Sequence, residues 1–327
     1  MARRGYLLAL FATLLALLVV LLGAWTRLSH AGLGCPDWPG CYGFLGVPSG
    51  ALQQALAELR YPQAPLEVDK GWYEMMHRYA AAALGLSTLA ITWQAWRQRQ
   101  ALGLALALLG LVMLQAAFGM WTVTLRLWPP VVTLHLLGGM STLGLLFLLT
   151  LRLAARPAVL RSPDPALRRL ALAALLLIAV QIALGGWVSA HYAAQACPDL
   201  PLCQGRWWPV MDFAEAFGLS PPLGLSYLGG VHEGEARTAI HLAHRLGAVL
   251  VALVALRLAW RLWQAGLVGM GGVLAGLLLL QLALGAGNVL LNFPAALALA
   301  HSGGAALLLL AAIFVNERVG RAPRGCT

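Results

Sequence analysis

Charged residues are scarce in this sequence, at 10% of its 327 positions, and only 12 residues are acidic. Low-complexity segments are absent as well. Hydrophobic residues make up 60% of the chain, and the mean hydropathy is +0.77. A water-soluble surface cannot be made from this composition, so the sequence predicts an integral membrane protein.

The first apolar run lacks a convincing small-residue cleavage site, although Arg3 and Arg4 precede it as in a secretory signal peptide. We therefore expect it to be retained as the first of eight transmembrane helices, each about 20 residues long. The predicted fold is all-α, with spans at 6–26, 73–96, 101–124, 130–152, 166–190, 237–262, 268–291 and 294–316.

The net charge of +10 would suit a nucleic-acid-binding protein, but the arginines follow a membrane topology signal instead. They gather at both termini and in the loops after even-numbered spans, which predicts that these segments and both termini are cytoplasmic. Ten of the twelve acidic residues fall on the opposite side. We expect the lipid bilayer, and no nucleic acid, as a partner.

One pattern occurs twice in the chain. CPDWPGC at 35–41 recurs as CPDLPLC at 197–203, and two histidines on separate apolar segments follow each copy. They are His77 and His135 in the first half, and His244 and His301 in the second. Duplication of a four-helix unit explains the repeat. It predicts two pseudo-symmetric four-helix bundles, at 1–155 and 166–327, joined by a cytoplasmic linker at 156–165 that is rich in proline and arginine.

Two long loops, roughly 27–72 and 191–236, lie on the predicted outer side and carry four of the five cysteines. Their spacing favours two local disulfides, Cys35 with Cys41 and Cys197 with Cys203, in an oxidising compartment. The alternatives are a shared four-thiolate zinc site and free thiols. Each loop also holds a short amphipathic stretch, the first of which Ser49 could cap.

The four histidines lie at matched depth, each a few residues into an even-numbered span from the outer face. A transition metal with two open trans positions suits a pair of imidazoles, and an iron porphyrin offers these within a flat apolar body. Two glycines follow His135 and two follow His301, which leaves room for a ring. A zinc site and a proton relay are the alternatives.

The first histidine of each pair stands in a related string, EMMHR at 74–78 and HLAHR at 241–245. Glu74 and His77 therefore share a helix face, as do His241 and His244. Arg78 and its counterpart Arg245 are candidate contacts for porphyrin propionates, although such arginines also extend to the membrane interface.

The chain resembles the bacterial haem A synthases over roughly residues 6–316. The resemblance rests on seven segments in this order: TRLSHAGLGCPDWPGCYG, EMMHRY, FGMWTVTL, VVTLHLLGG, GGWVSAHYAAQACPDLPLC, AIHLAHRLGA and ALAHSGGA. The resemblance implies two pseudo-symmetric four-helix bundles in the bacterial inner membrane. It also implies a reaction that oxidises a ring methyl of haem O to a formyl group, giving haem A for terminal oxidases. Haem b would be the cofactor in the C-terminal half, and haem O the substrate in the N-terminal half.

Carried over by motif, the resemblance implies that His244 and His301 are axial ligands of haem b. His77 and His135 would hold haem O, and Glu74 would be the catalytic carboxylate. The family's N-terminal disulfide, assigned a redox role, corresponds to the first Cys pair, and a second pair occurs in some members; we expect both to brace their loops. A haem O synthase and a second copy of the chain are candidate partners. One rival interpretation is a di-haem b electron-transfer protein that leaves its haem unmodified, and a second is a haem- or proton-handling transporter without chemistry.

Overall fold

A computed structural model describes residues 2–154, 164–218 and 222–320, and every regular element in these ranges is helical. Eight helices are long: α1 (Ala2–Leu28), α3 (Val68–Gln98), α4 (Leu102–Thr124), α5 (Pro129–Leu153), α6 (Pro165–Ala190), α8 (Gly234–Gln264), α9 (Val268–Leu290) and α10 (Ala295–Gly320). Three are short: α2 (Ala51–Arg60), the 3-10 turn η1 (Ala193–Gln195) and α7 (Phe213–Ala216).

Seven of these helices, α1, α4, α5, α6, α8, α9 and α10, are long and apolar enough to cross a membrane. Large apolar side chains such as Leu14, Leu176 and Leu253 are exposed on them, as expected of surfaces that face lipid. The prediction of an all-helical membrane protein is therefore confirmed. The remaining long helix, α3, has 31 residues and is more polar, with Asp69 and Lys70 near its start.

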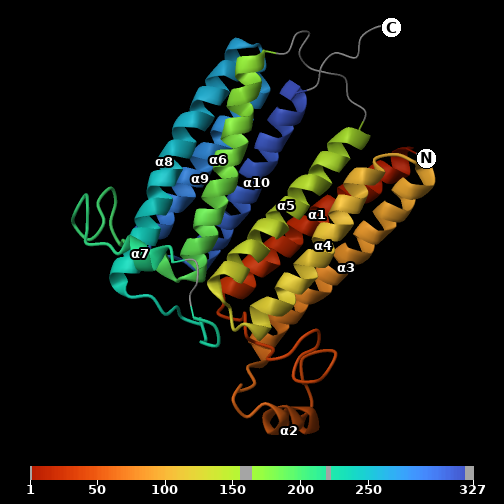
Figure 1. Cartoon of the computed structure of the whole chain (residues 1–327), viewed down its shortest axis with the longest axis vertical. Coiled ribbons are helices and arrows are strands. Elements are labelled where there is room, and N and C mark those ends of the chain that lie inside the picture. The colour runs from red at the N-terminus through yellow and green to blue at the C-terminus, as the bar shows by residue number, and fades with distance from the viewer. Residues whose placement is uncertain (1, 155–163, 219–221, 321–327) are drawn as a thin grey trace.

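The long helices lie in two groups of four, with α1, α3, α4 and α5 in one group and α6, α8, α9 and α10 in the other (Figure 1). The groups meet where α5 packs against α6 and where α10 packs against α1 and α5. Small residues on α1, Ala9, Ala12 and Ala16, are buried in the common core and permit a close approach of the neighbouring helices.

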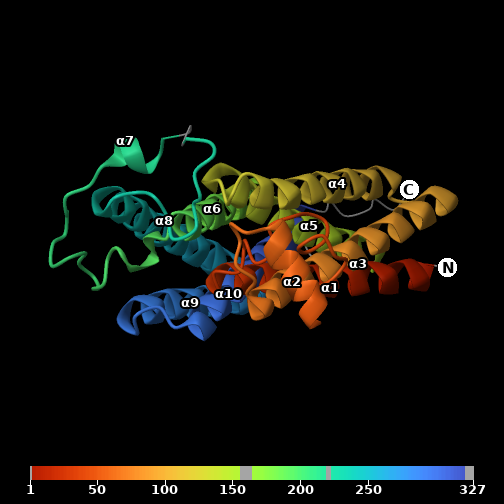
Figure 2. The same cartoon turned by 90° about the horizontal axis from the view of Figure 1, so that it is seen from below.

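The start of α1 and the end of α10 lie at one end of the molecule, and the two long loops lie at the other (Figure 1). Viewed from the loop end, α2 lies over the first group of helices, whereas α7 lies beside α8 (Figure 2). Gly50 rather than Ser49 is the N-cap of α2, without a side-chain hydrogen bond, so the cap predicted at Ser49 is wrong. The Ser49 amide instead donates to Gln53 Oε1.

Both loops are closed by a disulfide, as their cysteine spacing predicts. Cys35 bonds to Cys41, with Cα atoms 4.7 Å apart, and Cys197 bonds to Cys203, with Cα atoms 4.6 Å apart. We call the segments 35–41 and 197–203 the first and second Cys loops. Since their sulfurs are paired with one another, the four cysteines cannot form the alternative zinc site, and the described residues contain no other cluster of three metal ligands.

The predicted linker, 156–165, falls mostly outside the described residues, but its end is visible at α6. Asp164 is the N-cap of α6 and accepts a hydrogen bond from the Ala166 amide at 2.9 Å. This bond and a second from the Leu167 amide hold the pKa of Asp164 below its usual value. Arg261 of α8 also contacts this carboxylate at 3.0 Å, so the start of α6 is joined to the end of α8.

Removing the second disulfide tests whether it braces its loop. We expect Cys197→Ala/Cys203→Ala to lower the free energy of unfolding by about 2 kcal/mol, because even a short covalent loop restricts the unfolded chain. Thermal denaturation of the purified protein measures the change, with Cys326→Ala, which removes a cysteine of neither pair, as the control. An unchanged melting temperature would show that this disulfide does not brace the loop.

Candidate functional site

Each of the four histidines lies about two to three turns into its helix, counted from the loop end of the molecule. His77 is on α3 and His135 on α5, in the first group of helices. His244 is on α8 and His301 on α10, in the second group. The sequence-predicted pairs are thus placed at similar depth inside separate helix groups.

His77 and His135 lie close together, with ring centres 6.4 Å apart and ring planes at 86°. A metal bonds imidazole nitrogen at about 2 Å, so two imidazoles on opposite sides of one metal have centres about 6 Å apart. The Nδ1 atoms of both rings are buried without a hydrogen-bond partner among the described residues. The separation of the two rings is therefore close to the one that two imidazoles holding a single iron would have.

Each of the four rings lies against a glycine of a neighbouring helix. A Cβ atom at Gly23 of α1 would be 2.9 Å from His77 Cε1, and one at Gly119 of α4 would be 3.5 Å from His135 Cε1. The second group repeats the arrangement. A Cβ at Gly185 of α6 would be 3.2 Å from His244 Cε1, and one at Gly285 of α9 would be 3.1 Å from His301 Cε1. Glycine thus allows the helix backbone to approach each imidazole closely.

Two glutamines accompany the histidines of the second group. Gln181 Nε2 of α6 lies 3.0 Å from His244 Nδ1 and donates to the His244 carbonyl oxygen at 2.9 Å. Gln281 Nε2 of α9 lies 3.3 Å from His301 Nε2. The lone pair of that ring nitrogen could coordinate a metal ion instead of accepting a hydrogen bond from the Gln281 amide.

One of the two glycines after His135, and one of the two after His301, lies against a glutamine side chain. A Cβ at Gly138 would overlap the side chain of Gln115, and one at Gly304 would overlap that of Gln281. Gly138 and Gly304 thus make room for glutamine side chains of α4 and α9, whereas a Cβ at Gly139 would meet no atom within 4 Å.

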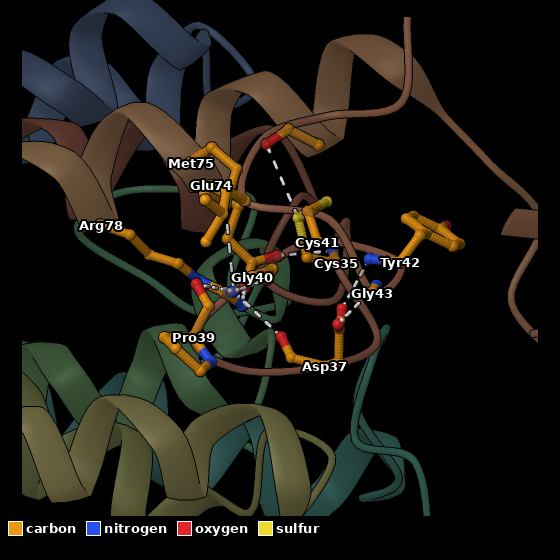
Figure 3. The surroundings of a disulfide bond; sticks show 12 residues. Cys35, Asp37, Pro39, Gly40, Cys41, Tyr42, Gly43, Glu74, Met75 and Arg78 are labelled. Carbon is orange, nitrogen blue, oxygen red and sulfur yellow. Dashed lines mark hydrogen bonds and ion pairs between the residues drawn. A yellow bond between two sulfur atoms is a disulfide. The ribbon is translucent and has the colours of Figure 1, made fainter. Parts of the chain in front are cut away.

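Glu74 lies against the first Cys loop, one helical turn before His77 (Figure 3). The residue is buried, with 5% exposed, and its Oε2 accepts a hydrogen bond from the Cys35 amide at 2.9 Å. Its Oε1 pairs with the guanidinium of Arg78. The carboxylate is therefore fixed between the loop and its own helix.

Arg78 also fastens the first Cys loop. Its Nη1 donates to the carbonyl oxygens of Asp37, at 2.9 Å, and of Gly40 (Figure 3). The Asp37 carboxylate in turn accepts from the Tyr42 and Gly43 amides at 2.6 and 2.7 Å. The aspartate of CPDWPGC thus closes the turn, and the arginine of α3 binds its carbonyl groups.

The second Cys loop is fastened in the same way. Arg245 donates to the carbonyl oxygens of Cys197, Asp199 and Leu202 at 2.7 to 2.9 Å. The Cys197 amide donates to His241 Nδ1 at 3.3 Å, so His241 takes the position that Glu74 has in the first group. Amides of Gly205 and Gln204 hold the pKa of Asp199 below its usual value. Arg78 and Arg245, predicted as propionate contacts, are thus engaged with loop carbonyls in this structure.

The family model described as COX15-CtaA, cytochrome oxidase assembly protein, matches residues 6–313. The chain belongs to the COX15-CtaA family. A protein of Shewanella oneidensis named heme A synthase is 45% identical over 305 residues, which cover 92% of each chain. A heme A synthase of Rhizorhabdus wittichii is 30% identical over 94% of this chain and 92% of its own, and one of Mesorhizobium japonicum is 31% identical over 94% and 87%.

Two side-chain contacts near the histidine pairs of this COX15-CtaA protein were not predicted from its sequence. Gln181, which contacts His244, lies one turn before Gly185 on the same face of α6. The spacing of four residues from Gly185 is the sequence signal that places Gln181 beside His244. His191, at the end of α6, is stacked on His232 with ring centres 4.4 Å apart. Only the folding of the second loop brings those two rings together.

Proposed function

We propose that this membrane protein is an oxidoreductase that converts haem O to haem A by oxidising a ring methyl group to a formyl group. Relatives named heme A synthase align with nearly its whole length. The observation that carries the proposal is the 6.4 Å separation of the His77 and His135 rings, which suits the two axial ligands of one iron. Taking a methyl group to an aldehyde removes four electrons and adds one oxygen.

The two helix groups would divide the work. His77 and His135 would hold the haem O substrate, while His244 and His301 would hold a resident haem b. When bound, a haem supplies one-electron transfer, which a four-electron oxidation requires nearby. This chain orients the imidazoles through the glycine contacts, and the buried alanines and leucines below them exclude water.

Glu74 is the proposed catalytic carboxylate. Its position one turn before His77 places it on the substrate side, and the Cys35 amide and Arg78 fix its orientation. A carboxylate held there can accept a proton or stabilise positive charge that develops on the reacting carbon. The disulfide of the first Cys loop supports this role by keeping the Cys35 amide in place.

The proposal includes α3 as an eighth span, in spite of its polar start. Its 31 residues are long enough to cross, and it packs between α1 and α4. Eight spans would place both termini on one side, and the arginines favour the cytoplasmic side of the cell membrane. The matching histidine and glycine contacts support two pseudo-symmetric halves, 1–155 and 166–327, with both Cys loops outside.

The decisive experiment supplies haem O to the purified, haem-loaded protein with an electron acceptor, extracts the pigments and separates them by chromatography. Conversion of haem O to haem A supports the proposed reaction. Unchanged haem O in a preparation that carries low-spin haem would instead favour the di-haem electron-transfer protein.

The glycine contacts give a direct test of the resident haem site. We expect Gly185→Val to remove most of the low-spin haem signal of the C-terminal half, because even a Cβ there would lie 3.2 Å from His244 Cε1. The optical spectrum measures the loss. Gly272→Val is the matched control, since a Cβ at this position of α9 meets no atom within 4 Å. An unchanged spectrum in the Gly185 variant would contradict the assignment.

A further inference from the structure

Four polar side chains gather at the loop end of the seam between the two helix groups. Arg27 comes from α1, His191 and Tyr192 follow α6, and Arg237 comes from α8. The Arg27 guanidinium carbon lies 3.8 Å from the centre of the Tyr192 ring. A Cβ at Gly230 would lie 3.2 Å from Arg237 Nη2, 3.3 Å from Tyr192 Cδ2 and 2.9 Å from the His191 carbonyl oxygen. We call these four residues the outer basic cluster.

The cluster has buried polar atoms that lack partners. Tyr192 Oη, His191 Nε2 and Arg237 Nε are all buried without a hydrogen-bond partner among the described residues. Such groups are rare in folded proteins, and three in one cluster indicate a place where a polar ligand can bind.

The cluster carries positive charge, so the ligand that it binds is expected to be an anion. Burial lowers the pKa of His191 to about 4, so its imidazole is neutral at pH 7, and Arg27 and Arg237 supply the charge. Among the described residues, neither arginine forms a salt bridge. The nearby Glu215 contacts His232 Nδ1 at 2.8 Å instead. A carboxylate bound between the two guanidinium groups would satisfy both charge and hydrogen bonding.

The position of the cluster relative to His244 indicates which carboxylate it binds. Arg237 precedes His244 by seven residues on α8, a rise of about 10 Å toward the loop end. His191 follows Gly185 by six residues on α6, about 9 Å in the same direction, and Gly185 is the residue against which the His244 ring lies. This offset is comparable with the distance from a porphyrin iron to its propionate carboxylates.

We propose that the outer basic cluster binds the propionate carboxylates of the haem held by His244 and His301, an inference that rests on the proposed function. Arg27 and Arg237 form charge-assisted hydrogen bonds to the carboxylate oxygens, and the Tyr192 hydroxyl donates a further one. Arg27 reaches the cluster from the other helix group, where its guanidinium also donates to the Ser189 carbonyl oxygen. The resident haem is thereby anchored across the seam.

The corresponding positions of the first group are built differently. His30 stands where the second group has Tyr192, and Lys70 stands where it has Arg237. Lys70 is already paired with Glu67 at 2.8 Å. The first group therefore has, at the position of Arg237, a cation that is already in a salt bridge, which suits a half that must release its haem after reaction.

Haem with blocked propionates tests the inference without measuring activity. The full-length chain in the His77→Ala background, produced without haem, is titrated with iron protoporphyrin IX and with its dimethyl ester. Affinity is read from the low-spin absorption. We expect the ester to bind about tenfold more weakly than the free acid. Arg27→Gln/Arg237→Gln should weaken binding of the free acid alone and bring the two affinities together.

Arg257→Gln is the matched control, because Arg257 is an exposed arginine of the same helix, α8, and should leave the tenfold preference intact. If the double variant does not fold, the single Arg27→Lys and Arg237→Lys variants keep the charge and should each lose part of the preference. Equal affinities for acid and ester before any cluster mutation would overturn the inference and leave the proposed function standing. Low-spin binding that survives His244→Ala would instead overturn the assignment of haem to this histidine pair.

Discussion

Replacing His77 by alanine is expected to stop haem A formation while the optical signal of the resident haem stays largely intact. His77 contributes one of the two rings whose centres lie 6.4 Å apart in the first helix group, and the second pair lies on other helices. Haem O that loses an axial ligand is no longer held in position for the reaction. Pigment chromatography gives the product, and the low-spin absorption of the purified variant reports the resident haem.

His244→Ala is the reciprocal variant and should remove the resident signal. A spectrum that falls equally in both variants would contradict the division of substrate and cofactor between the helix groups. Arg257→Gln is a suitable control, because Arg257 is exposed on α8, thirteen residues after His244.

Glu74→Gln is expected to lower the rate of haem A formation by about 10² to 10⁴-fold. Glutamine keeps an oxygen that can accept the Cys35 amide hydrogen bond, so the first Cys loop should stay closed over the site. It cannot act as a base or balance a developing positive charge. The rate is measured by pigment chromatography at fixed haem O, and haem content is measured on the same sample.

Glu67→Gln provides the comparison for this variant, since Glu67 precedes the same helix, is exposed, and pairs with the half-buried Lys70. Its rate should equal that of the unmodified chain. A Glu74→Gln variant with normal turnover would reduce Glu74 to a structural partner of Arg78.

The placement of the histidines could be predicted because it depends only on local geometry. A helix rises by a fixed amount per residue, so four histidines a few residues inside their spans must lie at similar depth. The disulfides were equally accessible, since a spacing of six residues with a proline turn brings Cys35 to Cys41 with little help from the rest of the fold.

The contacts of the arginines could not be predicted in this way. Arg78 and Arg245 have long side chains with many rotamers, and the carbonyl groups that they bind become available only after the Cys loops fold back onto the helices. The outer basic cluster has the same origin, because Arg27 and Arg237 are about two hundred residues apart and meet only when the two helix groups pack together. Nor could composition alone decide whether α3 crosses the membrane, because its polar start and end flank an apolar middle.

The glycine that lies against each imidazole affects how tightly a porphyrin can be bound. An imidazole packed closely against a glycine backbone has few accessible side-chain rotamers, so its orientation is fixed before a ligand binds. The conformational entropy lost on binding is then small, and more of the iron–nitrogen bond energy appears as affinity.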